Sequence, residues 1–129
     1  MKKPYNVYAQ HCPARMILDR VADKWTLLIL NILVERPMRF NQLKRDVEGI
    51  SQKVLSQTLK NLVRDGFVER RVFPSVPVTV EYSSTALGKT LAKPIAELTY
   101  WAEQNMDRVL LSQKKFDESS RELDDAISR

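Results

Sequence analysis

The sequence predicts a mainly helical protein with one small β-hairpin. Apolar residues recur every three or four positions through most of the 129 residues, which is the period of amphipathic helices. The pattern changes over residues 67–82, where β-branched and aromatic residues flank a segment bounded by two prolines. The helical period then returns and continues from residue 87 to residue 109. Short helices, a hairpin and a long C-terminal helical region are therefore expected, in that order.

Two short helices are expected after an irregular segment at residues 1–12. The first begins at Pro13, because proline is tolerated at a first helical position. The apolar residues that it is expected to bury are Met16, Ile17 and Val21. Asp23 can cap the second helix, which ends before Pro37 because proline disfavours helical geometry in the preceding residue. The apolar side of this second helix consists of Trp25, Leu28, Ile29, Ile32 and Leu33.

A third and a fourth helix follow at the spacing of a helix-turn-helix unit. Residues 38–39 form a short extended link, and the third helix runs from Asn41 to a stop at Gly49. Ser51 suits the N-cap of the fourth helix, because its hydroxyl can accept one of the amide protons that start a helix. Gly66 can adopt the left-handed conformation that ends this helix. Only about four residues separate the two helices, as in helix-turn-helix motifs.

The β-hairpin follows directly. Its strands are expected at residues 67–73 and 78–82, and its tip at residues 74–77. Three helices followed by a hairpin form the layout of a winged helix-turn-helix domain, in which the hairpin is the wing.

The last region is a long helix with a polar tail. Thr85 can cap it, and Pro94 either kinks it or divides it in two. The tail at residues 112–129 is polar and is expected to end in a short or frayed helix around residues 120–127. No repeat or linker interrupts the chain, so a single domain is expected over residues 1–129, with its core within residues 11–111.

The fourth helix has two contrasting sides. Leu55, Leu59 and Leu62 gather on one stripe at about 100° per residue. The opposite side is polar and cationic, with no acidic residue, and consists of Gln52, Lys53, Ser56, Gln57, Lys60 and Arg64. Serine and glutamine can bond base edges in a DNA major groove, and lysine and arginine can reach phosphate or guanine. The alternative is an ordinary solvated surface helix, because lysine and glutamine are good helix formers.

Positive charge is concentrated around this helix. The chain carries a net charge of +5, and residues 39–71 hold eight basic and four acidic residues, a surplus of four. Local basicity of this kind favours a polyanionic partner such as double-stranded DNA.

Other classes of function are poorly supported by the residues. His11 and Cys12 are the only residues of their types and adjoin in the chain, so they are badly placed as a catalytic pair or as a metal site. The three isolated glycines form no phosphate-binding loop. No apolar run approaches the roughly 18–20 residues that cross a bilayer, and the N-terminal lysines precede no signal-peptide core. We therefore expect a cytoplasmic protein that is not an enzyme, with no metal, cofactor or membrane partner.

The sequence resembles the HxlR-type family of winged helix-turn-helix transcriptional regulators, which are MarR-like. The resemblance covers about residues 11–103, and the matching segments are His11-Cys12-Pro13-Ala14-Arg15, Lys24-Trp25-Thr26-Leu27-Leu28-Ile29-Leu30, Arg39-Phe40-Asn41-Gln42-Leu43, Gly49-Ile50-Ser51-Gln52-Lys53-Val54-Leu55, Asp65-Gly66-Phe67-Val68-Glu69-Arg70 and Val80-Glu81-Tyr82. The chain has Ala22-Asp23 where the family usually has Gly-Gly, and Thr58 where it often has arginine. The resemblance implies a homodimer that represses or activates a neighbouring gene by binding an inverted repeat in its promoter.

Roles in DNA binding are predicted residue by residue. Base contacts are expected at the start of the fourth helix, which Ser51 caps, from Gln52, Lys53, Ser56 and Gln57. Phosphate contacts are expected from Lys60, Arg64, Arg39 and Asn41. The wing contributes Arg70, Arg71, Ser75 and Thr79. The residues predicted as core instead are Trp25, Leu28, Phe40, Leu55, Leu59, Leu62 and Phe67.

The chain has more apolar surface than a core of this size covers, and such an excess commonly marks an interface. The residues expected at a homodimer interface are Tyr5, Tyr8, Met16, Leu91, Ile95, Leu98, Trp101, Ala102, Met106 and Val109. Two-fold symmetry would place the two Ser51 helices in successive major grooves. The alternative is that the long helix only completes the monomer core.

Cys12 is a candidate redox-sensing residue. It precedes a helix N-terminus, with His11 and Arg15 close in sequence, and such surroundings favour the reactive thiolate. Some relatives with a cysteine at this position respond to oxidants, quinones or aldehydes. The alternatives are a buried, inert cysteine, control by a small ligand, sequence-indifferent DNA binding, and a winged-helix module that binds proteins.

Overall fold

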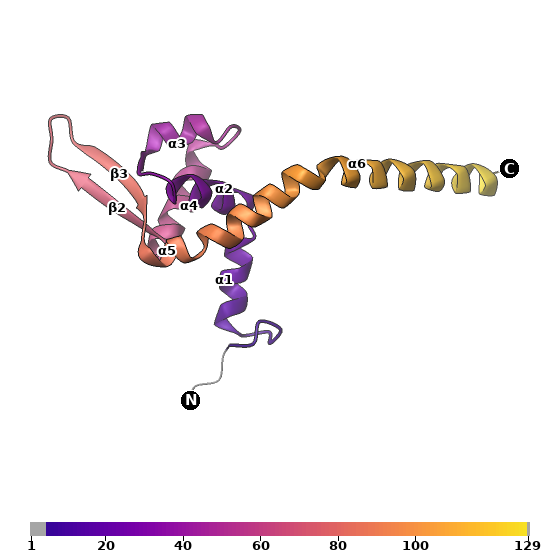
Figure 1. Cartoon of the computed structure of the whole chain (residues 1–129), viewed down its shortest axis with the longest axis horizontal. Helices are drawn as coiled ribbons and strands as arrows, with labels where there is room; N and C mark the ends of the chain where they lie inside the picture. Colours follow the sequence, from indigo (N-terminus) through magenta and orange to yellow (C-terminus); the bar gives the residue numbers. More distant parts are fainter. Residues whose placement is uncertain (1–4, 129) are drawn as a thin grey trace. The chain divides into compact units, whose positions relative to one another are not determined.

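The computed structural model describes residues 5–128 and is mainly helical with a small antiparallel sheet (Figure 1). The elements, in chain order, are α1 (Pro13–Val21), α2 (Lys24–Leu33), β1 (Met38–Arg39), α3 (Phe40–Asp46), α4 (Gln52–Arg64), β2 (Val68–Phe73), β3 (Thr79–Ser84), α5 (Ala86–Thr90) and α6 (Ala92–Ser128). The fold class is therefore confirmed. The chain forms two compact units, residues 1–95 and 96–129, and each is described by itself. The single domain expected over the whole chain stays a prediction.

The caps and turns expected from the sequence are present in the first unit. The Asp23 carboxylate accepts a hydrogen bond from the amide of Thr26 at 3.1 Å, so it caps α2. The Ser51 hydroxyl accepts one from the amide of Val54 at 3.1 Å and caps α4. Gly66 has a φ of +85° after α4, in the left-handed region that glycine adopts without strain. These signals fix where α2 and α4 begin and where α4 ends.

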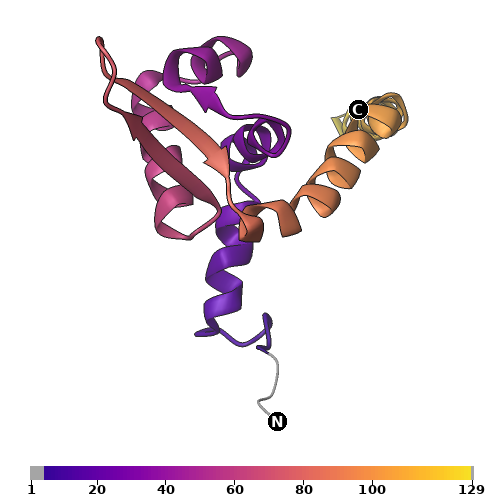
Figure 2. The same cartoon turned by 60° about the vertical axis from the view of Figure 1, so that its left-hand side comes forward.

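The sheet contains a strand that the sequence predicted only as a link. Residues 38–39 form β1, which pairs with β3 through Met38 opposite Tyr82 and Arg39 opposite Glu81. The sheet order is β1-β3-β2, so β3 is central. Figure 2 shows the hairpin of β2 and β3 beside α4, with its turn extending away from the helices.

One hydrophobic core joins the helices to the sheet. Its buried members are Ile29, Leu30, Leu33, Met38, Leu43, Val47, Ile50, Leu55, Leu59, Leu62, Phe67, Val68 and Ile95, with Trp25 and Phe40 packed against it. One core prediction is wrong. Leu28 is 39% exposed, because it lies on the outer side of α2, whereas Leu30 on the inner side is buried. Met16, expected to be buried by α1, is 60% exposed, whereas Ile17 packs against the core.

The C-terminal region differs from its prediction at three points. It divides at Leu91, between α5 and α6, and Pro94 lies in the first turn of α6, where no helical amide bond is lost. The polar tail is not a short or frayed helix, because α6 continues to Ser128. Ile95, expected at a dimer interface, is 2% exposed and belongs to the core of the first unit. Leu91 packs partly buried against the same core.

Candidate nucleic-acid interface

Helix α4 presents the expected polar side to solvent. Its buried stripe consists of Leu55, Leu59 and Leu62, which anchor it to the core. All six residues predicted for the opposite side are exposed, namely Gln52, Lys53, Ser56, Gln57, Lys60 and Arg64. Thr58, where relatives often have arginine, is buried and so lies away from this side. We call the six exposed residues the α4 outer face.

Two hydrogen bonds already engage polar side chains at the start of α4 and on its outer face. The Ser51 hydroxyl is used as the helix cap, so its capacity to accept from the α4 amide is already committed. The Gln57 side-chain amide donates to the Asn61 side-chain oxygen at 3.2 Å. The carbonyl oxygen of Gln57 and its second amide proton carry no part in that bond. This bond holds the exposed Gln57 side chain in one orientation.

An ion pair fixes the far end of α4. Arg20, in the last turn of α1, places its Nε 2.7 Å from a carboxylate oxygen of Asp65, the C-cap residue of α4. The two side chains are only 19% and 10% exposed, so water screens this pair less than a surface pair. The pair ties the orientation of α4 to α1, a link that sequence reasoning did not identify.

The two predicted wing arginines lie on opposite faces of the sheet. Successive strand residues alternate between faces. Arg70 points to the α4 side, where it lines a hollow of about 220 Å³ with Ser56 and Lys60. Arg71 lies on the other face, where its guanidinium is 3.5 Å from Glu69 and its strand partner is Glu81. Both arginines were predicted from the sequence as DNA contacts of the wing, but only Arg70 shares a surface with the α4 outer face.

A second basic hollow lies between α3 and the wing. Arg39 and Asn41 line it together with Thr79, so the structure brings these three predicted contacts together. Arg45, which was not predicted as a contact, lines the same hollow. Its signal in the sequence was its spacing of four residues after Asn41, which places both on one side of a helix.

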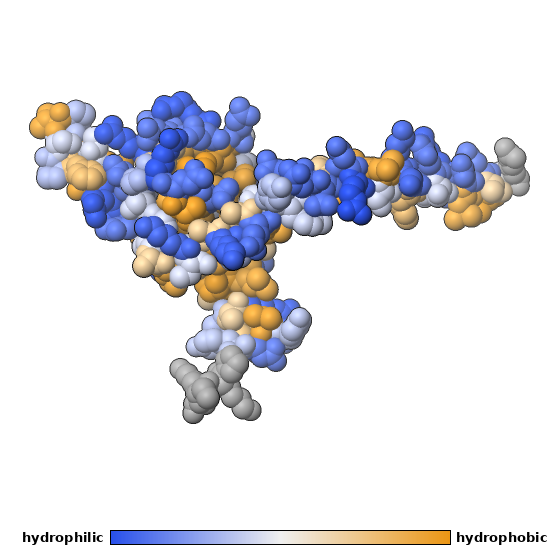
Figure 3. Space-filling model, in the orientation of Figure 1, coloured by the Kyte–Doolittle hydropathy of each residue, from blue (hydrophilic) through white to orange (hydrophobic). Residues whose placement is uncertain are grey.

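The tip of the wing uses its own polar groups. The Ser75 hydroxyl donates to the Pro77 carbonyl at 2.8 Å and lies 3.4 Å from the Thr79 hydroxyl. Ser75 is therefore engaged within the turn rather than free for a phosphate. Val76 and Val78 are exposed at the tip, which appears as a hydrophobic patch in Figure 3.

The acids near the interface are largely compensated. Asp65 pairs with Arg20, and Asp46 lies 3.8 Å from Arg36. Both arginines come from outside residues 39–71, the segment with the basic surplus. Within residues 5–128, the salt bridges of the structure involve none of the three cations of the α4 outer face, Lys53, Lys60 and Arg64.

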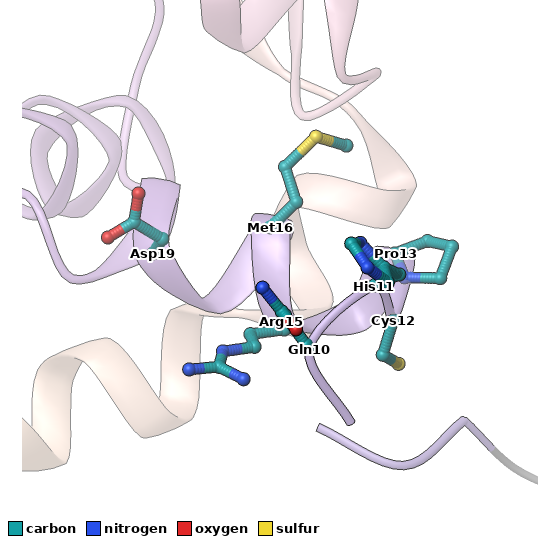
Figure 4. A pocket seen from close by; sticks show the side chains of 7 residues that line it. All are labelled: Gln10, His11, Cys12, Pro13, Arg15, Met16 and Asp19. Atoms are coloured by element: carbon teal, nitrogen blue, oxygen red, sulfur yellow. The ribbon is translucent and has the colours of Figure 1, made fainter. Parts of the chain in front are cut away.

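Cys12 lies apart from this surface, at the N-cap of α1. It is half-buried and lines a hollow of about 490 Å³ with Gln10, His11, Pro13, Arg15, Met16 and Asp19 (Figure 4). Figure 4 shows the Cys12 sulfur and the Arg15 guanidinium extending in different directions. Closeness in sequence therefore does not bring these two groups together in this conformation.

Two kinds of feature are absent from the part of the chain that the structure describes. Over residues 5–128, no three side chains of His, Cys, Asp or Glu are grouped so that they could hold a metal ion. In the same part of the chain, no helix is both long and apolar enough to span a membrane.

Comparison with known proteins agrees with this geometry. The model of the HxlR-like helix-turn-helix family matches residues 20–110. The HTH-type transcriptional regulator YtfH of Escherichia coli K12 is 43% identical over 108 residues, which cover 84% of this chain and 86% of YtfH. The solved structure of the regulator ytfH from Salmonella typhimurium has a TM-score of 0.80 at 40% identity, over 86% of this chain and 99% of that one. The redox regulator HypR in its oxidised form has a TM-score of 0.68 at 35% identity, over 73% of this chain and 97% of HypR. The chain is a transcriptional regulator with a winged fold, and it belongs to the HxlR-like helix-turn-helix family.

Proposed function

We propose that the protein binds a specific operator as a homodimer and that the α4 outer face reads the major groove. The observation that carries this proposal is that all six residues of that face are exposed while the leucines behind them are buried. A rigid helix with its polar side outward is the element that helix-turn-helix proteins insert into the major groove. Gln52, Lys53, Ser56 and Gln57 are the proposed base contacts, and Lys60 and Arg64 the proposed phosphate contacts.

Exposed apolar residues outside the core support the homodimer. In the first unit, Tyr5, Tyr8 and Met16 are exposed, and Figure 3 shows hydrophobic side chains over α1. In the second unit, the exposed members of the predicted interface are Leu98, Trp101, Ala102 and Met106, and Val109 is half-buried. Apolar surface of this kind commonly marks an interface. The proposed interface keeps the predicted residues except Ile95.

The wing is proposed to hold the DNA backbone, and Arg71 tests this role. Arg71→Ala should weaken binding to all duplexes similarly and lower the slope of log affinity against log salt by about 1. Glu69→Gln should have the opposite effect and strengthen binding to all duplexes, because it removes the carboxylate that lies 3.5 Å from the Arg71 guanidinium. Both effects are measured by fluorescence anisotropy over a range of salt. A loss confined to one base pair of the operator would contradict the backbone role.

We further propose that oxidation of Cys12 switches DNA binding. Two observations favour this role: Cys12 lines an open hollow beside exposed Met16, and the similar protein HypR is described as a redox regulator. If two Cys12 thiols join across a dimer, they lose two protons and two electrons to the oxidant as the disulfide forms.

The switch predicts that a thiol oxidant such as diamide changes the operator affinity of the wild-type protein by at least about tenfold, typical of allosteric coupling. Cys12→Ser should keep its affinity unchanged over the same titration. Because Cys12 is the only cysteine, the variant is also free of side reactions at other thiols. Identical responses of the two proteins would remove the proposal and would favour control by a small ligand.

A further inference from the structure

The C-terminal half of α6 lies beyond the family domain. The family model ends at residue 110, whereas α6 continues to Ser128. Four large apolar side chains of this extension are exposed: Leu111 by 53%, Phe116 by 71%, Leu123 by 62% and Ile127 by 73%. Most helices in proteins owe their stability to the packing of an apolar side, so the exposed apolar side chains of this extension indicate a binding partner.

One side of the second unit is free of charge along its whole length. At about 100° per residue, the residues within roughly 60° of the Phe116 direction form this side. They are Leu98, Trp101, Ala102, Asn105, Val109, Ser112, Gln113, Phe116, Ser119, Ser120, Leu123 and Ile127. The twelve charged residues of 96–128 all lie elsewhere on the helix. Figure 3 shows hydrophobic side chains recurring along α6 among hydrophilic ones.

The spacing on this side is that of a coiled-coil seam. Val109, Phe116 and Leu123 are seven residues apart, and each is followed three residues later by a small one: Ser112 and Ser119 on this side, and Ala126 just at its edge. A strict repeat of seven residues keeps a narrow seam against another helix, whereas a helix in a globular core has a wider apolar stripe. The seam is therefore shaped for one helix.

The order of large and small residues favours an antiparallel partner. In an antiparallel pair of identical helices, the large residue of each repeat faces the small residue of the other copy. One register then places Phe116 opposite Ser119, Leu123 opposite Ser112, and Val109 opposite Ala126, each twice. A parallel pair would instead stack Phe116 on Phe116 and would leave poorly filled layers of serine on serine.

Charges beside the seam agree with the same register. Lys115 and Glu122 flank the seam on one edge, and the antiparallel register brings Lys115 of each copy next to Glu122 of the other. In a parallel pair, Lys115 would meet Ser120 and Glu122 would meet Ile127. The sizes of the seam residues and the charges beside the seam thus favour the same antiparallel register, each independently of the other.

We propose that residues 109–126 of α6 pair antiparallel with the same segment of a second copy of this chain. The surface is self-complementary, as a two-fold interface between identical chains requires. Nucleic acid and anionic lipid fit it poorly, because residues 111–128 carry five acidic and three basic side chains. This pairing of α6 does not depend on DNA binding, so an experiment can contradict the pairing without contradicting the proposed DNA binding, and the reverse.

Introduced cysteines test the direction of pairing in the full-length Cys12→Ser protein. The double variant Ser112→Cys/Leu123→Cys should form a covalent dimer under mild oxidation, because residues 112 and 123 of opposite copies face each other. Each single variant should stay monomeric on a non-reducing gel, since the two copies of one position lie about 16 Å apart along the helix and a disulfide needs about 7 Å. A control double variant on the outer side, Lys114→Cys/Arg121→Cys, should not cross-link. Cross-linking of the single variants, or none in the double variant, would overturn the proposal.

Charge exchange tests the register by sedimentation of full-length protein. Lys115→Glu and Glu122→Lys should each weaken self-association by about three- to tenfold, because each places like charges together twice. The double exchange should restore it, and Lys114→Glu on the outer side should leave it unchanged. Equal effects of the single and double exchanges would contradict the register.

Discussion

Lys53→Ala and Gln57→Ala are each expected to weaken binding to the cognate operator by about 1–3 kcal/mol, roughly 5- to 150-fold in affinity. Both side chains are exposed on the first turns of α4, where a recognition helix meets base edges. Gln57 is already oriented by its bond to Asn61, so its loss removes a pre-organised contact. The measurement is a titration of labelled operator by fluorescence anisotropy at fixed salt.

Two comparisons make this prediction specific. Lys114→Ala removes the same charge from exposed α6 and should leave operator affinity nearly unchanged. Binding of Gln57→Ala to a random duplex should differ little from wild type, because that binding depends on phosphate contacts. If operator affinity persists unchanged in both α4 variants, the recognition surface has been placed on the wrong helix face.

Leu59→Ala is expected to lower the free energy of unfolding by about 2–5 kcal/mol. The side chain is 1% exposed and lies in the core directly behind the α4 outer face. Its truncation removes buried apolar area and leaves a cavity that the close-packed interior fills only partly. Denaturant unfolding followed by circular dichroism measures the change, at several protein concentrations because a dimer would make it concentration-dependent.

Leu111→Ala is the matched control, since it removes the same atoms from a side chain that is 53% exposed. Its cost should stay below about 1 kcal/mol. Equal losses in the two variants would show that α4 does not depend on its buried leucines.

The local signals predicted the helical elements well. Capping by Asp23, Ser51 and Thr85, and the left-handed glycine at 66, depend on a few neighbouring residues, and the structure confirms each one. Gly49 is left-handed too, but α3 already ends at Asp46. Strand β1 was missed because two residues show no alternation and their partners in β3 lie more than forty residues away.

The length of α6 was underestimated for a different reason. The tail is highly charged, a composition that suggested a frayed helix end. However, no glycine or proline follows Pro94 in the sequence to interrupt the helix. Spacings of four residues such as Lys114 to Glu118 and Asp117 to Arg121 support a helix through opposite charges. The seven-residue repeat also continues through it.

Much of the candidate interface was also predictable, because exposure of a capped amphipathic helix follows from its own sequence. The separation of Arg70 from Arg71 and the position of Arg45 were not, since they depend on strand register and on how α3 meets the wing. The Arg20–Asp65 pair joins positions 45 residues apart in the chain and has no local signature.

The most direct test of the central claim is a footprint of the protein on the promoter region beside its own gene, with wild type and Lys53→Ala compared at equal concentration. We expect wild type to protect two inverted half-sites whose centres lie about one helical turn, 10–10.5 base pairs, apart in the major groove, and the variant to lose this protection. Protection without sequence preference, or an unchanged footprint in the variant, would contradict the account.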